Sequence, residues 1–285
     1  MKITEKTLAE FRAWLADLGL AEGTLDDYER TMERVDEEPG GYLARLRDTT
    51  LSPKTRRKEL AAIRQWGEFV GDPTIREKCK KLRLPPPRRM KAKIPLERAQ
   101  LFALIDEIGR SKDISEPTRA VLGIMACRGL RCGDALRLRR SEILDAQEKG
   151  ILSFLAKGER RLEFRVLKTW KRYLDLLARQ GGDWTHVRDL VSPGADPKKA
   201  QRSAARAIER ALEGLALSIQ IRGVYPHQLR RTYAVQYLQA MRGDPEALVK
   251  LTQHMQWAQM TTAMEYVDHA RGDELDTVAE RIFER

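Results

Sequence analysis

Three consecutive prolines most constrain how this chain can fold. Pro85 to Pro87 lie in the run from residue 76 to residue 93, REKCKKLRLPPPRRMKAK, which holds nine basic residues and one acidic residue. Proline fixes φ and lacks the backbone N–H that a helix needs, so consecutive prolines keep the chain extended. We therefore expect two domains, residues 1–84 and 94–285, joined by a basic linker over residues 85–93.

The charge of the chain indicates a polyanionic partner. The 285 residues suffice for two modest domains, and their net charge of +11 creates a field that attracts nucleic acid. A basic protein with an unrelated function has the same charge, so composition alone does not decide. Each phosphate that a basic side chain neutralises releases counterions, which favours binding of duplex DNA. We therefore expect the basic linker to bind DNA, and a solvated linker without a partner is the alternative. The candidate DNA-binding residues of the linker are Arg88, Arg89, Lys91 and Lys93.

The first domain is predicted to be a small bundle of four helices. Apolar residues recur at helical spacing in four segments, which are expected to begin at Thr4, Thr24, Tyr42 and Ser52. Thr24 is expected to cap the second helix, because Asp27 follows it at the spacing of a capping box.

Basic side chains gather near the start of the fourth predicted helix. There, Lys54, Arg56 and Arg57 would add positive charge to the free backbone N–H groups of a helix start, and both favour phosphate. These three are the candidate DNA-binding residues of the first domain, and a solvated helix face is the alternative.

The second domain is predicted to mix helices with a small sheet. Between residues 142 and 168, short apolar runs are separated by Lys149-Gly150 and Lys157-Gly158, which is typical of antiparallel strands with tight turns. The fold class is therefore mainly α with a small antiparallel sheet, an α-helical first domain and an α+β second domain. Helices are expected over residues 96–108, 117–128, 169–179, 197–213, 227–241, 244–254 and 273–284.

Several classes of protein are disfavoured by the sequence. No segment approaches the roughly 20 apolar residues that span a bilayer, and the N-terminus does not resemble a signal peptide. Cys79, Cys127 and Cys132 form no CxxC pair, so neither a disulfide framework nor a zinc site is expected. We expect a cytoplasmic protein, associated with DNA, with no membrane partner and no metal or other cofactor.

Two motifs resemble those of one enzyme family. The run GLRCGDAL from residue 129 resembles the G-L-R-x-x-E-x-L box around the first catalytic arginine of tyrosine recombinases, with Arg131 as the arginine and Asp134 as the acid. His227 and Arg230 lie in HQLR, which resembles the H-x-L-R box of the same family. Arg231 follows where the family often has histidine. The resemblance implies a core-binding first domain and a catalytic second domain.

The remaining family positions occur in the same order along the chain. Lys157 lies in Ala-Lys-Gly on the predicted hairpin, which resembles the turn that carries the catalytic lysine of the family. Tyr266 lies in MEYVDH, a segment that resembles the one bearing the nucleophilic tyrosine. The family has histidine or tryptophan nine positions before that tyrosine, and Trp257 occupies this position. His254 is the alternative, at a spacing of twelve.

The chemistry of the family explains why these residue types occur together. Attack by tyrosine on a phosphodiester builds negative charge on the phosphoryl oxygens, which two guanidinium groups stabilise without a metal. The resemblance assigns this role to Arg131 and Arg230. It assigns Tyr266 as the nucleophile that forms a 3′-phosphotyrosyl intermediate, which stores the bond energy.

Proton transfer and orientation fall to the other family positions. A tyrosine, with a pKa of about 10, needs a proton acceptor or a positive field, and His227 is the expected base. Lys157 is expected to protonate the departing 5′ oxygen. The indole N–H of Trp257 can donate a hydrogen bond to the phosphate, and Asp134 can orient an arginine or His227.

The resemblance implies a site-specific DNA recombinase, or integrase, that exchanges strands through a Holliday junction. Such enzymes act as a tetramer on synapsed DNA. The predicted C-terminal helix of this chain, residues 273–284, is expected to dock on a neighbouring protomer of that tetramer. Docking on the core of its own protomer is the alternative. The free protein is expected to be a monomer. Two other functions remain open: a type IB topoisomerase, which relaxes DNA, and a catalytically silent DNA-binding regulator.

Overall fold

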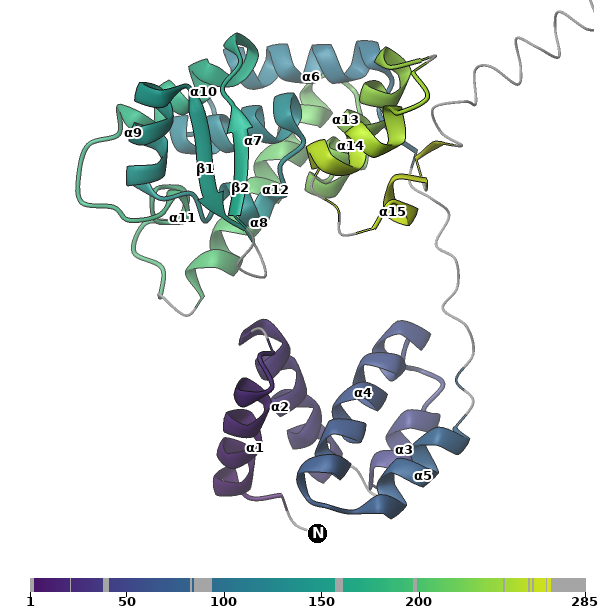
Figure 1. Cartoon of the computed structure of the whole chain (residues 1–285). Coiled ribbons are helices and arrows are strands. Elements are labelled where there is room, and N and C mark those ends of the chain that lie inside the picture. The colour runs from purple at the N-terminus through teal and green to yellow at the C-terminus, as the bar shows by residue number, and fades with distance from the viewer. Residues whose placement is uncertain are drawn as a thin grey trace, which may run out of the picture. The chain divides into compact units, whose positions relative to one another are not determined.

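The computed structural model describes most of the chain. The described residues are 3–20, 22–37, 41–82, 84, 94–156, 161–196, 199–242, 244–255, 257, 259–264 and 266–267. They are mainly helical with a two-stranded antiparallel sheet, which confirms the predicted fold class (Figure 1). The chain divides into two compact units, residues 1–92 and 93–285. Within the described residues, no helix is long and apolar enough to cross a membrane.

The first unit is a bundle of short helices around an aromatic core. Phe11 lies edge-on to Trp66 with ring centroids 5.0 Å apart, and Phe69 lies 5.4 Å from Phe11. Two helices start where predicted, at Thr4 and Ser52, and each of these side chains caps its helix by accepting a backbone N–H of the first turn. The helices are α1 (Glu5–Asp17), α2 (Glu22–Glu37), α3 (Gly41–Arg47), α4 (Pro53–Phe69) and α5 (Pro73–Lys81).

Two predictions for the first unit are wrong. The helix expected to begin at Thr24 begins at Glu22, so Thr24 is not its cap. The first part of the basic run from residue 76 belongs to α5, a fifth helix that the four-helix prediction missed. Asp72 caps α5 by accepting the N–H of Thr74 at 2.8 Å, and Cys79 is fully buried on its inner face. Cys79 and the partly buried Ile75 pack against the core of the first unit, so α5 forms despite its many charged residues.

The second unit is built around α7 (Glu116–Arg128), of which ten of thirteen residues are buried. It packs against α6 (Arg98–Arg110), α10 (Lys168–Ala178), α12 (Ala200–Ser218) and α13 (Pro226–Ala240). Short helices connect these, namely α8 (Cys132–Ala135) and α11 (Val187–Val191). After α13, α14 (Ala247–Met255) and α15 (Thr261–Met264) form a separate core cluster with the end of α13.

The predicted sheet is confirmed over part of its range and wrong at its start. Strand β1 (Ile151–Leu155) pairs antiparallel with β2 (Arg161–Arg165). Residues expected to form the preceding strand belong to α9 (Arg140–Lys149), which ends at Gly150 with φ of +68°. Lys149-Gly150 is thus a helix terminus rather than a turn, since glycine readily adopts the left-handed conformation that ends helices.

The remaining predicted helices agree with the structure to within a few residues, with two larger differences. The helix predicted over residues 197–213 continues to Ser218, and the one predicted from residue 244 begins at Ala247. Helices α8, α11 and α15 were not predicted. The C-terminal helix predicted over residues 273–284 lies outside the described residues.

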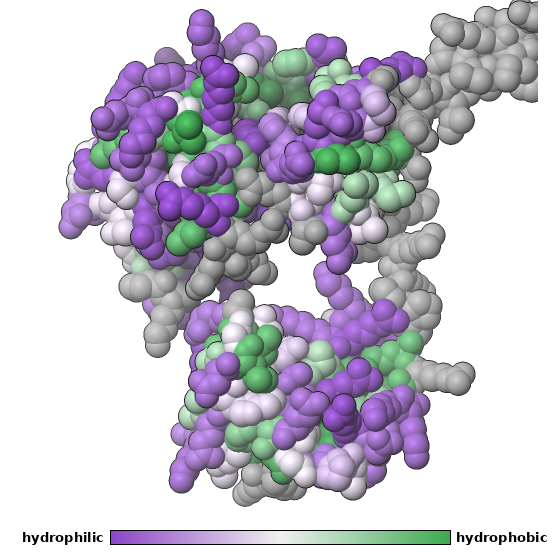
Figure 2. All heavy atoms as spheres, viewed as in Figure 1, coloured by the Kyte–Doolittle hydropathy of each residue, from purple (hydrophilic) through white to green (hydrophobic). Residues whose placement is uncertain are grey.

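Gly129 places α7 close to α13. It ends α7 with φ of +69°, and its N–H donates to the carbonyl oxygen of Met125 at 2.9 Å. A Cβ atom at this position would lie 2.8 Å from the ring of Tyr233, so both the backbone conformation and the close approach require glycine. On the face of each unit seen in Figure 2, hydrophilic residues predominate and hydrophobic residues form separate patches.

Candidate active site

Arg230 lies at the centre of the candidate site. It belongs to α13 and is only 4% exposed. Its Nη1 donates to the carbonyl oxygen of Gly129 at 2.6 Å, and its Nη2 donates to that of Met255 at 2.7 Å. One guanidinium therefore joins the end of α7 to the end of α14. Burial lowers the pKa of Arg230 to about 10, and the charge of Arg131 contributes to the shift.

Arg131 approaches the site from the loop between α7 and α8. Its side chain is 42% exposed, and its Nη1 lies 3.6 Å from Oδ2 of Asp134. Asp134 is buried, and its other carboxylate oxygen lies 3.9 Å from Nη1 of Arg137. The buried Asp134 carboxylate faces both arginines and so helps to orient their guanidinium groups. The exposed part of the Arg131 guanidinium remains accessible to a ligand.

His227 lies in the first turn of α13 and reaches the surface. Partial burial lowers its pKa, and the positive charges of Arg230, Arg231 and Arg131 lower it further. These charges disfavour the imidazolium form, so His227 is neutral at pH 7 and able to accept a proton.

Trp257 and Tyr266 form a parallel stack beside the arginines. Their ring centroids are 5.1 Å apart, and the ring planes differ by 2°. The guanidinium carbon of Arg230 lies 5.6 Å from the Trp257 ring, and that of Arg231 lies 5.6 Å from the Tyr266 ring. Tyr266 is only 3% exposed. The Tyr266 side chain is therefore almost fully enclosed in this conformation.

His254, the alternative to Trp257, has a different environment. Its Nε2 lies 2.5 Å from Nη1 of Arg128 and 2.6 Å from the hydroxyl of Tyr233. Burial lowers its pKa to about 4, and the charges of Arg128 and Arg230 add to this effect. The structure therefore places Trp257, and not His254, in ring contact with Tyr266.

The other candidate residues fall into two groups. Lys157 and the linker residues Arg88, Arg89, Lys91 and Lys93 lie outside the described residues. The three on α4 lie in the first unit, where Lys54 and Arg57 are exposed and Arg56 is half-buried.

The structure adds residues that the motifs did not identify. Arg231 was noted only as a departure from histidine, yet it lies over the Tyr266 ring. Arg128 directly precedes the Gly-Leu-Arg motif and follows the uncharged run from residue 120 to residue 127, and a single charge after such a run was the available signal. Tyr233 carried no signal of its own, because its contact with His254 depends on how α13 packs.

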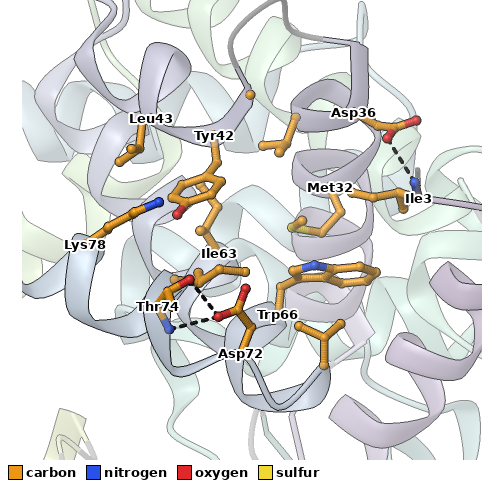
Figure 3. Close-up of a pocket in the computed structure, with 14 residues that line it drawn as sticks. Ile3, Met32, Asp36, Tyr42, Leu43, Ile63, Trp66, Asp72, Thr74 and Lys78 are labelled. Atoms are coloured by element: carbon orange, nitrogen blue, oxygen red, sulfur yellow. Dashed lines mark hydrogen bonds between the residues drawn. The ribbon is translucent and has the colours of Figure 1, made fainter. Parts of the chain in front are cut away.

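A hollow of about 540 Å³ lies in the first unit. Figure 3 shows residues that line it, among them the apolar or aromatic Met32, Tyr42 and Trp66 and the charged Asp72 and Lys78. It belongs to a different unit from Arg230 and Tyr266. Among the described residues of both units, no three His, Cys, Asp or Glu side chains are grouped as they would be to hold a metal.

Solved structures with similar folds are recombinases and integrases. The integrase of transposon Tn1549, in complex with circular intermediate DNA, is 15% identical, with a TM-score of 0.60 over 94% of this chain and 98% of that one. A lambda integrase dimer bound to a COC′ core site is 17% identical, with a TM-score of 0.59 over 93% of this chain and 77% of that one. XerH recombinase, bound to a palindromic difH substrate after cleavage, is 15% identical, with a TM-score of 0.55 over 92% and 78%. These likenesses establish the fold.

The sequence comparisons establish the family. Tyrosine recombinase XerC of Shewanella amazonensis is 25% identical, and the match covers 91% of each chain. The model of the phage integrase family matches residues 95–272, which is more than half of the chain. The chain therefore belongs to the phage integrase family, the tyrosine recombinases that break and rejoin DNA.

Proposed function

We propose that this enzyme is a site-specific recombinase that cleaves duplex DNA with Tyr266 as its nucleophile. One observation carries the proposal: the buried guanidinium of Arg230 lies 5.6 Å from the Trp257 ring, which stacks on Tyr266. The charge of Arg131 also acts on Arg230, so two cations lie close to one tyrosine. This grouping suits a reaction in which a tyrosine attacks a phosphodiester, because nearby cations stabilise the negative charge that develops on the phosphoryl oxygens.

The cleavage step assigns a role to each group. The phenolic oxygen of Tyr266 bonds to the phosphorus of the scissile phosphate, and the bond from phosphorus to the 5′ oxygen breaks. His227 accepts the phenolic proton, in keeping with its lowered pKa. Lys157 gives a proton to the departing 5′ oxygen. Arg131 and Arg230 bind the phosphoryl oxygens, and their charge replaces the metal ion that many nucleases use.

Two further positions orient these groups. The indole N–H of Trp257 donates to a phosphoryl oxygen once Tyr266 has left the stack, while its ring remains beside Arg230. The carboxylate of Asp134, 3.6 Å from Arg131, holds that guanidinium toward the phosphate.

Strand exchange follows from the covalent link. The 3′-phosphotyrosyl bond is a phosphodiester, so a 5′-hydroxyl from a second duplex attacks it without an external energy source and releases Tyr266. Exchange of one pair of strands gives a Holliday junction. Four protomers are required for two duplexes, and we propose that residues 273–284 of each protomer dock on its neighbour.

DNA binding is proposed for both units. The Tn1549 and lambda integrases and XerH were solved with DNA, which supports duplex DNA as the partner here. We propose that residues 1–84 bind the core site and that residues 94–285 perform the chemistry. The positive groups assigned to the DNA backbone are Lys54, Arg56, Arg57, Arg88, Arg89, Lys91 and Lys93.

A nicked suicide substrate tests the nucleophile. After cleavage the short fragment that begins with the new 5′-hydroxyl diffuses away, so the protein stays covalently attached to the other fragment and migrates slowly on a denaturing gel. Wild type and Tyr225→Phe are expected to form this adduct, while Tyr266→Phe forms none. Tyr225 is a suitable control because it lies close enough to Tyr266 for the two hydroxyls to interact electrostatically. An adduct with Tyr266→Phe contradicts the assignment, and no adduct with wild type favours a silent DNA-binding protein.

A two-site plasmid then separates recombination from relaxation. The proposed recombinase produces a deletion or an inversion between two copies of the site and requires both copies. A type IB topoisomerase relaxes a supercoiled plasmid with one site or none and leaves the order of the sequence unchanged. Relaxation alone contradicts the proposed function.

A further inference from the structure

Arg128 is a buried cation held by one short segment of α14. It is the last residue of α7 and is 6% exposed. Its Nη1 lies 2.5 Å from Nε2 of His254, and its Nη2 donates to the carbonyl oxygen of His254 at 3.2 Å. The guanidinium also lies 4.0 Å from the ring centroid of Phe164 in β2. One arginine thus contacts both the side chain and the backbone of a single residue.

These contacts determine the protonation state of His254. A guanidinium can only donate hydrogen bonds, so Nε2 must be the unprotonated nitrogen and the ring must be neutral. The hydroxyl of Tyr233 lies 2.6 Å from the same nitrogen, and the rings of Tyr233 and Tyr237 stack on the imidazole at 5.7 Å and 5.0 Å. The charge of Arg128 disfavours an added proton, as does that of Arg230, in line with a pKa lowered chiefly by burial to about 4.

Arg128 and Arg230 together cap the C-terminus of α14. The last carbonyl groups of a helix have no intrahelical partner, and positive charge is favourable there. Arg128 binds the carbonyl of His254, and Arg230 binds the next one, that of Met255. Two residues further, the N–H of Trp257 donates back to the carbonyl oxygen of Thr252 at 3.0 Å. The position of Trp257 therefore depends on where α14 ends.

We propose that Arg128 and His254 form a positioning pair that fixes the end of α14 and thereby holds Trp257 and Tyr266 in register with Arg230. Neither residue contacts the phosphate. The proposal rests on the proposed function, because it concerns the same cleavage reaction. It assigns to His254 a role distinct from that of a phosphate ligand, although the sequence offers it as the alternative to Trp257.

Cleavage kinetics test the pair. Arg128→Met and His254→Leu are each expected to slow adduct formation at saturating suicide substrate by about 10- to 100-fold, with the dissociation constant for DNA changed by less than about 3-fold. The double variant should be no slower than the slower single variant, because the two residues act as one unit. His254→Gln, whose amide oxygen can accept from Arg128, should regain most of the rate.

The control separates positioning from general destabilisation. Leu104→Ala in α6 removes a fully buried side chain and is expected to lower the melting temperature without slowing cleavage in the folded protein. A His254→Leu rate within about 3-fold of wild type overturns the proposal, as do independent, multiplicative effects of the two single variants.

Histidine NMR tests the contact without any DNA. The groups facing His254 are Arg128 of α7 and Arg230, Tyr233 and Tyr237 of α13. The His254 ring signals should stay constant above about pH 5, consistent with a pKa of about 4. In Arg128→Met this pKa should rise toward 6.5, and an unchanged titration overturns the pairing. If wild type forms no adduct, the proposed function fails, while this titration still decides whether the pair exists.

Discussion

At the scale of single residues, Arg230 has two functions in this account. It holds two helix ends together, and it is the proposed ligand of the phosphate. Two of its N–H groups bind the carbonyl oxygens of Gly129 and Met255, so its orientation is fixed before any substrate arrives. A guanidinium has more N–H groups than these two carbonyls use, and the remainder can bind a phosphate. Such preorganisation stabilises developing charge with little rearrangement during the reaction.

Replacement of Arg230 by lysine is expected to slow adduct formation by about 100- to 1000-fold. A single ammonium group cannot bind two separated carbonyl oxygens and a phosphate at once. The rate at saturating suicide substrate measures the effect. Arg140→Lys is the matched control, because Arg140 donates to the carbonyl oxygen of Gly182 and lies over Trp184. Equal rates for the two variants would contradict the role given to Arg230.

The pH dependence of cleavage tests His227 as the base. Burial and three nearby arginines lower its pKa below the ordinary 6.5, so the neutral, proton-accepting form predominates at pH 7. Cleavage should be constant above pH 6.5 and should decline only in more acidic solution, as His227 becomes protonated. Arg131→Gln removes one of the three positive charges, so the decline should begin at a higher pH. An acid limb that does not move in this variant argues against His227.

The sequence identified six of the residues that the structure gathers in this site, because family motifs fix their spacing. These are Arg131, Asp134, His227, Arg230, Trp257 and Tyr266. It did not identify the contacts of Arg128 and Arg231, since these depend on how α7, α13 and α14 pack. Nor could it indicate that Tyr266 is enclosed, because burial of one ring is a property of the folded unit.

At the scale of elements, the ends of helices position the site. Arg131 follows the end of α7, and Arg230 binds the end of α14. The sequence predicted α7 and α13 well, since Pro117 and Gly129 mark the two ends of α7 and Pro226 marks the start of α13. It missed α5 and α9, because the charges of α5 resembled a linker and Gly150 resembled a turn. Glycine adopts the same left-handed backbone conformation at the end of a helix and in a hairpin turn. The sequence alone therefore cannot distinguish these two structures, and tertiary packing decides between them.

Alanine substitutions at two helix ends test the role of Gly129. Gly150 has φ of +68° and nothing within 4 Å of an added Cβ, whereas an added Cβ at Gly129 meets the Tyr233 ring at 2.8 Å. Gly150→Ala should lower the free energy of unfolding by about 1 kcal/mol, from backbone strain alone. Gly129→Ala should lower it by about 2–4 kcal/mol, because strain and steric overlap add. Urea denaturation of the second unit measures both, and equal losses would show that the Tyr233 contact is unimportant.

At the scale of the whole molecule, two units with separate cores share one excess of positive charge. The proline run predicted two parts, and the core of each lies within its own unit. Both units contribute to the net charge of +11, and this charge is expected to dominate the affinity of the protein for DNA. Affinity should therefore fall steeply with salt.

The salt dependence of DNA binding tests the contribution of α4. When the logarithm of the association constant is plotted against the logarithm of the salt concentration, the slope is negative. Each phosphate contact makes this slope steeper by about 0.9. Lys54→Gln should make the slope shallower by about that amount. Lys6→Gln removes the same charge from α1, where the lysine lies 3.9 Å from Glu10, and should leave the slope unchanged. Equal slopes for Lys54→Gln and wild type would remove Lys54 from the DNA-binding surface.

The most direct test of the account is to map the covalent link to one residue. Trypsin cleaves after Lys250 and Arg271, and Tyr266 is the sole tyrosine of the peptide between them, residues 251–271. After reaction with a suicide substrate and nuclease digestion, mass spectrometry should find this peptide heavier by the remaining nucleotide, with fragment ions that place it on Tyr266. A nucleotide on any other peptide, or none on a protein that binds the same DNA, would contradict cleavage by Tyr266.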